Sequence, residues 1–295
     1  MIEKRLVQWY ASDAGVDLDI AEREIVLTYV LRILADQGLL QYLAFKGGTA
    51  IRKLYLGNLG RFSLDLDFTA RGEVDSEELI LDIVGSLHDQ SHYGLTFTIP
   101  ATDYYTTQDS CGAEVTYRHE WVTTGRFGIQ ISLRAQPLLP VRSMPLRNER
   151  YFSWLGIEPV VVPSLDLHEI IGEKIRAAAQ RSRVRDLFDL YQLANQPVDH
   201  SLVRRIAVIK CWETNFAFNP AAFLAGLDSG QYDWGDLRRL VQRGWQFSPE
   251  MIISGVRRDY DFLEELIVEE TILAGDPYRR ENQTYQMLIK NLEQS

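Results

Sequence analysis

The chain of 295 residues is long enough for one large domain or two ordinary ones with a buried core. Hydrophobic residues make up 46% and charged residues 24%, and no run approaches the roughly 20 apolar residues that span a bilayer, so no membrane association is expected. The formal net charge of −10 excludes a general polyanion binder, because non-specific nucleic-acid binding depends on Lys and Arg. Contact with RNA then requires a local basic patch, and a basic partner protein also fits this charge.

The cellular location is indicated by the N-terminal segment and the cysteines. The first residues are charged and lack an apolar core, so no signal peptide is expected. Cys111 and Cys211 form neither a disulfide framework nor a zinc-binding pattern. These features predict a cytoplasmic protein.

The first half of the chain mixes helical and strand patterns. Spacing of apolar residues and the positions of Gly and Pro define the elements. In chain order we expect a helical region at 1–42, a short strand at 43–48, a short helix capped by Thr49, a strand at 62–70, an amphipathic helix at 76–90 and β structure at 93–135.

The pattern changes after a loop-rich stretch at 136–163 that holds five prolines. From residue 164 onward only helical periods and turns are found, with Ser164 as the N-cap of the first helix. We therefore predict an α+β fold with a mixed domain at 1–163 and an all-helical domain at 164–295.

The stretch "SLDLDF" places two carboxylates on one face of the strand expected at 62–70. Because a strand sends alternate side chains to opposite faces, Asp65 and Asp67 are neighbours with Cα atoms roughly 7 Å apart. Mg²⁺ takes oxygen ligands from one or two carboxylates and completes its shell with water and phosphates. The same pattern also fits an amphipathic strand with a solvated acidic face.

Upstream, "KGGTA" places two glycines where a helix begins. Backbone N–H groups at a helix N-terminus attract phosphate, and Gly47 and Gly48 let it approach closely, while Lys46 adds a charge and Thr49 a hydroxyl. A turn that needs a positive φ angle explains the glycines equally well. Together with the Asp pair, however, the order of these motifs favours a site for nucleotidyl or phosphoryl transfer.

A basic block follows at 173–190. Lys174 and Arg181 are seven residues apart and therefore share a helical face. Such a face can hold the phosphates of a nucleotide, with Asp186 or Asp189 orienting the lysine or acting as a base. A helix surface covered by ion pairs is the alternative interpretation.

These three blocks, "LAFKGGTAIRKLY", "RFSLDLDF" and "LHEIIGEKIRAAAQRSRVRDLFDLYQL", resemble the AbiEii family of nucleotidyltransferase toxins, including its MenT-like members. The resemblance covers roughly residues 30–195 in the order of the family. It implies a DNA polymerase β-like nucleotidyltransferase core with an appended helical domain. It also implies a type IV toxin–antitoxin or phage-abortive system, a cognate antitoxin, Mg²⁺ or Mn²⁺, and transfer of a nucleotide from an NTP to tRNA acceptor ends.

The resemblance also implies particular site residues. The catalytic positions are Asp65, Asp67, Lys174 and Asp189, of which Asp65 and Asp67 are the metal ligands. The nucleotide-binding positions are Gly47, Gly48, Thr49, Ser63, Arg185 and Asp186, with Lys46 beside them.

The wider superfamily places a third metal-site carboxylate on a later strand. The corresponding stretch "FGIQISLRA" has Gln130 and Ser132 on one face and no acid. We therefore expect a metal site with fewer protein ligands, or a contribution from Asp189 in the helical domain.

The leading hypothesis is a metal-dependent toxin that adds a nucleotide to RNA, at the 3′ end of tRNA, and blocks translation. The alternatives are a protein-directed nucleotidyl- or phosphotransferase and an inactive binding module of a toxin–antitoxin pair. Phosphorylation of Ser63 would add about −1.5 to −2 charge beside the metal pair and compete with nucleotide. The particular NTP, tRNA and antitoxin, and the oligomeric state, are left open by the sequence.

Overall fold

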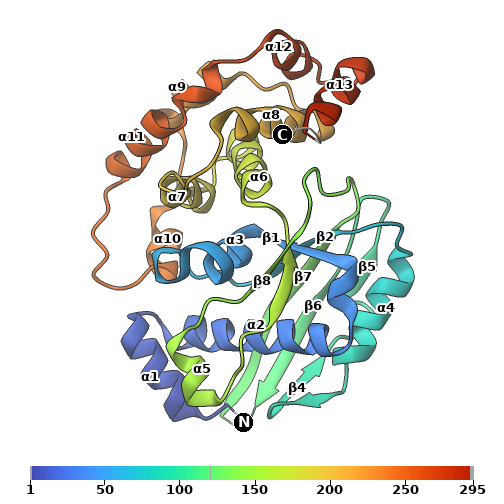
Figure 1. The fold of residues 1–295 in the computed structure, drawn as a ribbon. Coiled ribbons are helices and arrows are strands. Elements are labelled where there is room, and N and C mark those ends of the chain that lie inside the picture. Colours follow the sequence, from blue (N-terminus) through green and yellow to red (C-terminus); the bar gives the residue numbers. More distant parts are fainter. Residues whose placement is uncertain (1, 120, 293–295) are drawn as a thin grey trace. The chain divides into compact units, whose positions relative to one another are not determined.

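The structure, a computed structural model, describes residues 2–119 and 121–292 (Figure 1). Two compact units are present. We call Met1–Pro137, Val141–Ser164 and Arg238–Gly244 the sheet unit, and Leu138–Pro140, Leu165–Leu237 and Trp245–Ser295 the helical unit. The assignment of a nucleotidyltransferase domain to 1–163 and of a contributing helical domain to 164–295 stays a prediction, because compactness alone gives neither unit a role.

The sheet unit is built around a mixed β-sheet. Its strands are β1 (Leu43–Lys46), β2 (Leu66–Ala70), β3 (Ser91–His92), β4 (Leu95–Thr98), β5 (Tyr104–Thr106), β6 (Ser110–His119), β7 (Val122–Ser132), β8 (Arg142–Pro145) and β9 (Val161–Ser164). They follow the order β3-β4-β6-β7-β2-β1-β9-β8, and β5 pairs with β6. The β2–β7 and β1–β9 pairs are parallel and the others are antiparallel.

Several sequence predictions for this unit are confirmed, and the structure corrects others. Strands β4 to β7 match the β structure expected at 93–135. The stretch at 136–163 is not only loop, because it contains β8, α5 (Arg150–Leu155) and β9. Strand β2 begins at Leu66 rather than at Phe62, since the Phe62 N–H donates to the Leu240 carbonyl (2.7 Å) instead of to a neighbouring strand.

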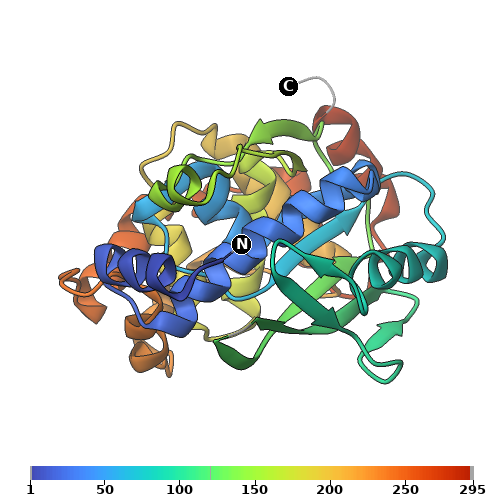
Figure 2. The same ribbon diagram turned by 90° about the horizontal axis from the view of Figure 1, so that it is seen from below.

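Helices cover one face of the sheet. The expected N-terminal helices are α1 (Lys4–Ala14) and α2 (Leu18–Asp36), followed by a 3₁₀ turn, and the expected helix at 76–90 is α4 (Ser76–Leu87). Helix α2 crosses the strands in both views (Figures 1 and 2). The Asp75 side chain caps α4 by accepting from the N–H groups of Glu77 and Glu78.

Alternation along the strands separates an apolar face from a polar one. The fully or almost fully buried positions face the helices and form the core, and they include Leu66 and Phe68 of β2, Ala113 and Val115 of β6, and Ile129 and Ile131 of β7. Each large side chain buried in this way contributes about 1.5–3 kcal/mol. The residues between them in sequence point to the opposite, polar face.

In the helical unit, every regular element among the described residues is a helix, as the sequence predicts. These helices are α6 (Leu167–Gln180), α7 (Val184–Leu193), α8 (His200–Glu213), α9 (Pro220–Gly226), α11 (Pro249–Asp259), α12 (Val268–Ala274) and α13 (Asn282–Leu292), and α10 (Trp234–Leu240) runs from the helical unit into the sheet unit. Across the two described ranges, no helix combines the length and apolarity needed to cross a membrane.

The start of α6 differs from the prediction. Asp166, not Ser164, is the N-cap, and its carboxylate accepts from the His168 N–H (2.9 Å). Ser164 instead belongs to β9, where its hydroxyl donates to the Phe45 carbonyl (3.0 Å). The hydroxyl therefore fastens an end of β9 to β1 and does not begin the helix.

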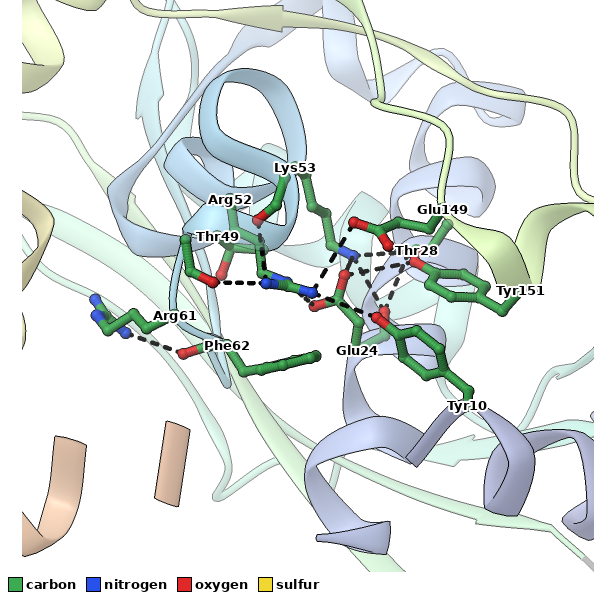
Figure 3. Close-up of polar contacts among 12 residues, drawn as sticks. Tyr10, Glu24, Thr28, Thr49, Arg52, Lys53, Arg61, Phe62, Glu149 and Tyr151 are labelled. Atoms are coloured by element: carbon green, nitrogen blue, oxygen red, sulfur yellow. Dashed lines mark hydrogen bonds and ion pairs between the residues drawn. The ribbon is translucent and has the colours of Figure 1, made fainter. Parts of the chain in front are cut away.

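Buried charges attach the helical segment 47–56 to α2 (Figure 3). This segment consists of α3 (Gly47–Ala50) and a π-helical continuation at Ile51–Leu56. Lys53 Nζ lies 2.6 Å from Glu24 Oε1 of α2 and donates to Thr28 Oγ1 (2.8 Å), while Arg52 Nε lies 3.6 Å from Glu24 Oε2. We call Glu24, Thr28, Arg52 and Lys53 the Glu24 cluster.

The ionisation of Glu24 and of Lys53 depends on the contacts between the charged groups of the Glu24 cluster. Burial opposes ionisation of Glu24, but Lys53 and Arg52 outweigh it and hold the pKa of this carboxyl below its ordinary value. Burial lowers the pKa of Lys53, and the Glu24 carboxylate opposes that shift. Removing Glu24 would leave the Lys53 ammonium uncompensated in the interior.

We predict that Glu24→Ala lowers the free energy of unfolding by about 3–5 kcal/mol, because Lys53 then stays buried without its carboxylate and Arg52 keeps only the longer contact with Glu149 (3.9 Å). Urea denaturation followed by circular dichroism measures the change. Asp36→Ala is the matched control, since it breaks an exposed pair with Arg32 on the same helix and is expected to cost less than about 1 kcal/mol. Equal effects of the two changes would contradict the structural role of the Glu24 cluster.

Candidate active site

The aspartates at the start of β2 lie on the polar face of the sheet. Asp65 is exposed just before the strand, and half-buried Asp67 lies within it, beside Gln130 of the parallel neighbour β7. The Asp65 carboxylate accepts from the Gly128 N–H (2.9 Å). Both aspartates line the same cavity of about 480 Å³.

The glycine pair at the start of α3 is packed against site residues. Gly47 has φ +74°, and a Cβ built there would lie 2.3 Å from Asp67 Oδ2. A Cβ at Gly48 would lie 2.4 Å from the Arg61 guanidinium and 3.2 Å from Ser63 Oγ. No side chain fits either position, so the bare backbone of the helix start lies directly against Asp67, Arg61 and Ser63.

Lys46 and Thr49 flank the glycines in different ways. Lys46 lies opposite Asp67 in the antiparallel β1–β2 pair and therefore shares its face of the sheet. The sequence predicted that Thr49 caps a helix. That prediction is wrong, because the helix already begins at Gly47. Its fully buried hydroxyl donates to the Asp65 carbonyl and so fixes the start of β2.

Another carboxylate approaches the pair from an unexpected strand. Glu114 of β6 lies opposite Gly128 of β7. A Cβ at Gly128 would lie 3.3 Å from Asp65 Oδ1 and 3.9 Å from Glu114 Oε2, so the glycine leaves the space between the two carboxylates open. Glu114 lines the cavity together with Asp65 and Asp67.

The donor set fits a divalent cation held by few protein ligands. Within residues 2–119 and 121–292, no group of three or more His, Cys, Asp or Glu side chains is arranged to hold a metal ion. Mg²⁺ needs only one or two carboxylates when substrate phosphates and water complete its shell. Asp65 and Asp67, beside an open cavity, provide that set.

In the helical unit, Lys174 of α6 is buried between two carboxylates of α7. Its ammonium lies 3.0 Å from Asp186 Oδ1 and 2.7 Å from Asp189 Oδ2. Burial opposes ionisation of Asp186, but Lys174 and Arg181 outweigh it and lower the pKa of this carboxyl to about 2. Arg185 forms a bidentate pair with Asp236 (2.6 Å for both bonds). Lys174, Asp186 and Asp189 therefore form buried ion pairs, whereas the pair of Arg185 and Asp236 is partly exposed.

Arg61 and Glu114 were not predicted from the sequence. Arg61 is part of the quoted motif "RFSLDLDF", but its approach to Gly48 depends on the path that the chain takes from the segment 47–56 to β2. Glu114 alternates correctly within β6, yet only the pairing of β6 with β7 brings it opposite Gly128. Neither relation has a signal in local sequence.

Comparison with known proteins gives the family. The family model described as "Nucleotidyl transferase AbiEii toxin, Type IV TA system" matches residues 29–262, which is most of the chain. A comparison with curated proteins finds no match.

Among solved structures, MenT4, a nucleotidyltransferase toxin from Mycobacterium tuberculosis H37Rv, shares the fold with a TM-score of 0.84. The identity is 23%, and the alignment covers 99% of both chains. The CD-NTase CdnG from Bradyrhizobium diazoefficiens, solved in complex with GTP, aligns over 98% of this chain and 96% of its own at 13% identity. Its TM-score of 0.25 is too low to indicate a shared fold. The family match, which spans the glycine turn, the aspartate pair and the Lys174 block, shows that the chain belongs to the AbiEii family of nucleotidyltransferase toxins of type IV toxin–antitoxin systems.

Proposed function

We propose that this protein transfers a nucleotide from an NTP to RNA, at the 3′ acceptor end of tRNA, and thereby blocks translation. The observation that carries the proposal is the approach of Gly47, at a helix start, to Asp67 beside the cavity. A phosphate-binding element and a carboxylate pair meet there, as nucleotidyl transfer requires. The family supports the reaction class, and the tRNA acceptor follows from the resemblance of the three sequence blocks.

In this proposal, the start of the segment 47–56 binds the triphosphate. Backbone N–H groups at Gly47 and Gly48 face it, and Lys46 and Arg61 add positive charge. Thr49 acts indirectly, because its hydroxyl is already donated to the Asp65 carbonyl. Ser63 lies beside Gly48, at the same phosphate-binding region.

Asp65 and Asp67 would hold the divalent cation. Bound Mg²⁺ or Mn²⁺ would neutralise the charge that develops on the phosphates. In the transfer, the acceptor hydroxyl oxygen bonds to the α-phosphorus, and the bond from that phosphorus to the bridging oxygen breaks. Pyrophosphate leaves with the electron pair, and the hydroxyl proton passes to solvent.

The helical unit serves the same reaction in this proposal. Following the family motif, Lys174 binds the nucleotide and Asp189 is the late catalytic acid. Asp186, which stays ionised because its pKa is about 2, fixes the Lys174 ammonium, and Arg185 belongs to the same motif. These roles rest on the resemblance.

We also propose a cognate antitoxin as partner, a cytoplasmic location and a role in phage defence by abortive infection. The type IV family supports the antitoxin and the defence role, and the tRNA and NTP substrates of this proposal are found in the cytoplasm.

We predict that Asp65→Asn lowers nucleotide transfer by at least about 100-fold, because the charge that balances a cation is lost while the amide oxygen still accepts from the Gly128 N–H. Purified protein is incubated with total tRNA and each labelled NTP in turn, with Mg²⁺, with Mn²⁺ and without metal. Asp109→Asn, an exposed aspartate paired with Arg134, is the control with unchanged transfer.

Three results would overturn parts of this proposal. Label that migrates with protein instead of RNA would indicate the protein-directed enzyme. Full transfer and full growth arrest with Asp65→Asn would remove the aspartate from the mechanism. Undiminished transfer without any metal would show that the reaction needs no cation.

We further predict that Gly47→Ala abolishes transfer, because the added methyl group displaces Asp67. Gly72→Ala is the matched control: its φ of +71° carries the same backbone strain of about 1–2 kcal/mol, but a Cβ there meets nothing within 4 Å. The transfer assay and a melting curve are measured for both. Similar stability with transfer lost only in Gly47→Ala is the expected result, and equal transfer in both would contradict the role of the glycine turn.

A further inference from the structure

An exposed tyrosine lies at the far side of the aspartate cavity. The register of four neighbouring strands places Asp67 of β2, Gln130 of β7, Gly112 of β6 and Tyr105 of β5 in one row across the polar face. Tyr105 lines the cavity with both aspartates. The row therefore connects the metal-binding end of the cavity to an aromatic ring.

The ring leans over the sheet toward the aspartates. A Cβ at Gly112 would lie 3.1 Å from the Tyr105 hydroxyl oxygen and 3.2 Å from its Cε1, so the ring occupies the space that a side chain on β6 would fill. Adjacent strands are about 4.8 Å apart, which puts Gly112 about 10 Å from Asp67. The aromatic surface is thus two strands from the carboxylate pair.

Tyr105 is not explained by packing. Its side chain is 42% exposed and lies outside the apolar core. Among the residues that the structure describes, the hydroxyl has no hydrogen-bond partner and the ring no aromatic contact. A large, exposed ring that lies over a glycine and lines the cavity offers a stacking surface.

We propose that this cavity receives the terminal nucleoside of the RNA acceptor, with its base stacked on Tyr105. The inference rests on the proposed function and deepens it by locating the acceptor. The cavity volume of about 480 Å³ lies within the range of sites for small ligands.

The direction of transfer favours the acceptor over the NTP. Attacking and leaving oxygens lie roughly in line in phosphoryl transfer. The phosphate-binding helix start and Lys46 are on the β1 side of Asp67, whereas the cavity extends over β7, β6 and β5 on the other side. When pyrophosphate leaves toward β1, the acceptor hydroxyl enters from the side of Tyr105.

Charge in the cavity favours a nucleoside over a phosphate chain. Among the residues that the structure describes, the lining includes four carboxylates, from Asp65, Asp67, Asp103 and Glu114, and one cation, from Arg126. Such a lining repels a continuous phosphate backbone. A neutral terminal nucleoside can enter, and stacking on an aromatic side chain tolerates any base.

The kinetic test compares Tyr105→Ala with Tyr105→Phe. We expect Tyr105→Ala to raise the KM for tRNA by about 5- to 150-fold, with the KM for NTP unchanged, and Tyr105→Phe to behave as wild type because stacking needs the ring and not the hydroxyl. Tyr42→Ala, which removes an equally exposed tyrosine of the sheet unit, is the matched control. A raised KM for NTP instead, or no change, would overturn the proposal.

A binding test separates this inference from the proposed function. The probe is a short RNA hairpin with a single-stranded 3′ tail, and a second probe lacks only the 3′-terminal base. Both are titrated against Asp65→Asn and Asp65→Asn/Tyr105→Ala. We expect loss of the base to weaken binding in the first protein and to have no effect in the second.

The two assays give distinguishable failures. Tyr105-dependent binding without any labelling of RNA by the wild type would leave the nucleoside site standing and refute the proposed function. Labelling of RNA with equal binding of both probes by both proteins would leave the function standing and refute the nucleoside site.

Discussion

The buried carboxylate of Glu24 is the constraint on which the arrangement of the sheet unit depends. It faces Lys53 and Arg52 from within α2, where water cannot substitute for a missing partner. Because both basic residues belong to the π-helical continuation of α3, the same contacts fix the helix start at Gly47. Arg52 also donates to the Gly60 carbonyl (2.6 Å), which constrains the chain that leads to Arg61 and β2. One buried cluster therefore positions both parts of the proposed phosphate site, the helix start at Gly47 and the chain at Arg61.

The polar face of the sheet shows how glycine creates a site. Gly128 leaves open the space between Asp65 and Glu114, and Gly112 makes room for the ring of Tyr105. On the opposite face, the alternate residues of the same strands are buried apolar core. Strand pairing that is required for packing on one face thus also fixes the row of Asp67, Gln130, Gly112 and Tyr105 on the other, since a shift of one residue would exchange the two faces.

Distribution of charge, rather than net charge, reconciles an acidic protein with phosphate chemistry. The chain carries −10 overall, yet Lys46 and Arg61 lie at the helix start that the proposal assigns to the triphosphate. The cavity on the other side of Asp67 is lined mainly by carboxylates. In this proposal the two sides of the aspartate pair select for different parts of the substrates, a charged triphosphate and a neutral nucleoside.

By itself, the sequence determined the mixed first half and the helical second half, the alternating strand at Asp67 and the family motifs, because these depend on periodicity and on short-range spacing. Tertiary structure decided where β2 begins, since the Phe62 N–H donates to the Leu240 carbonyl far along the chain. It also decided the roles of Thr49 and Ser164, whose hydroxyls donate to backbone carbonyls of other segments and do not cap helices. It also decided that Glu114, Arg61 and Tyr105 lie near the aspartates or the glycine turn. Those relations come from strand register and from contacts between distant segments. A local pattern of residues indicates neither of them.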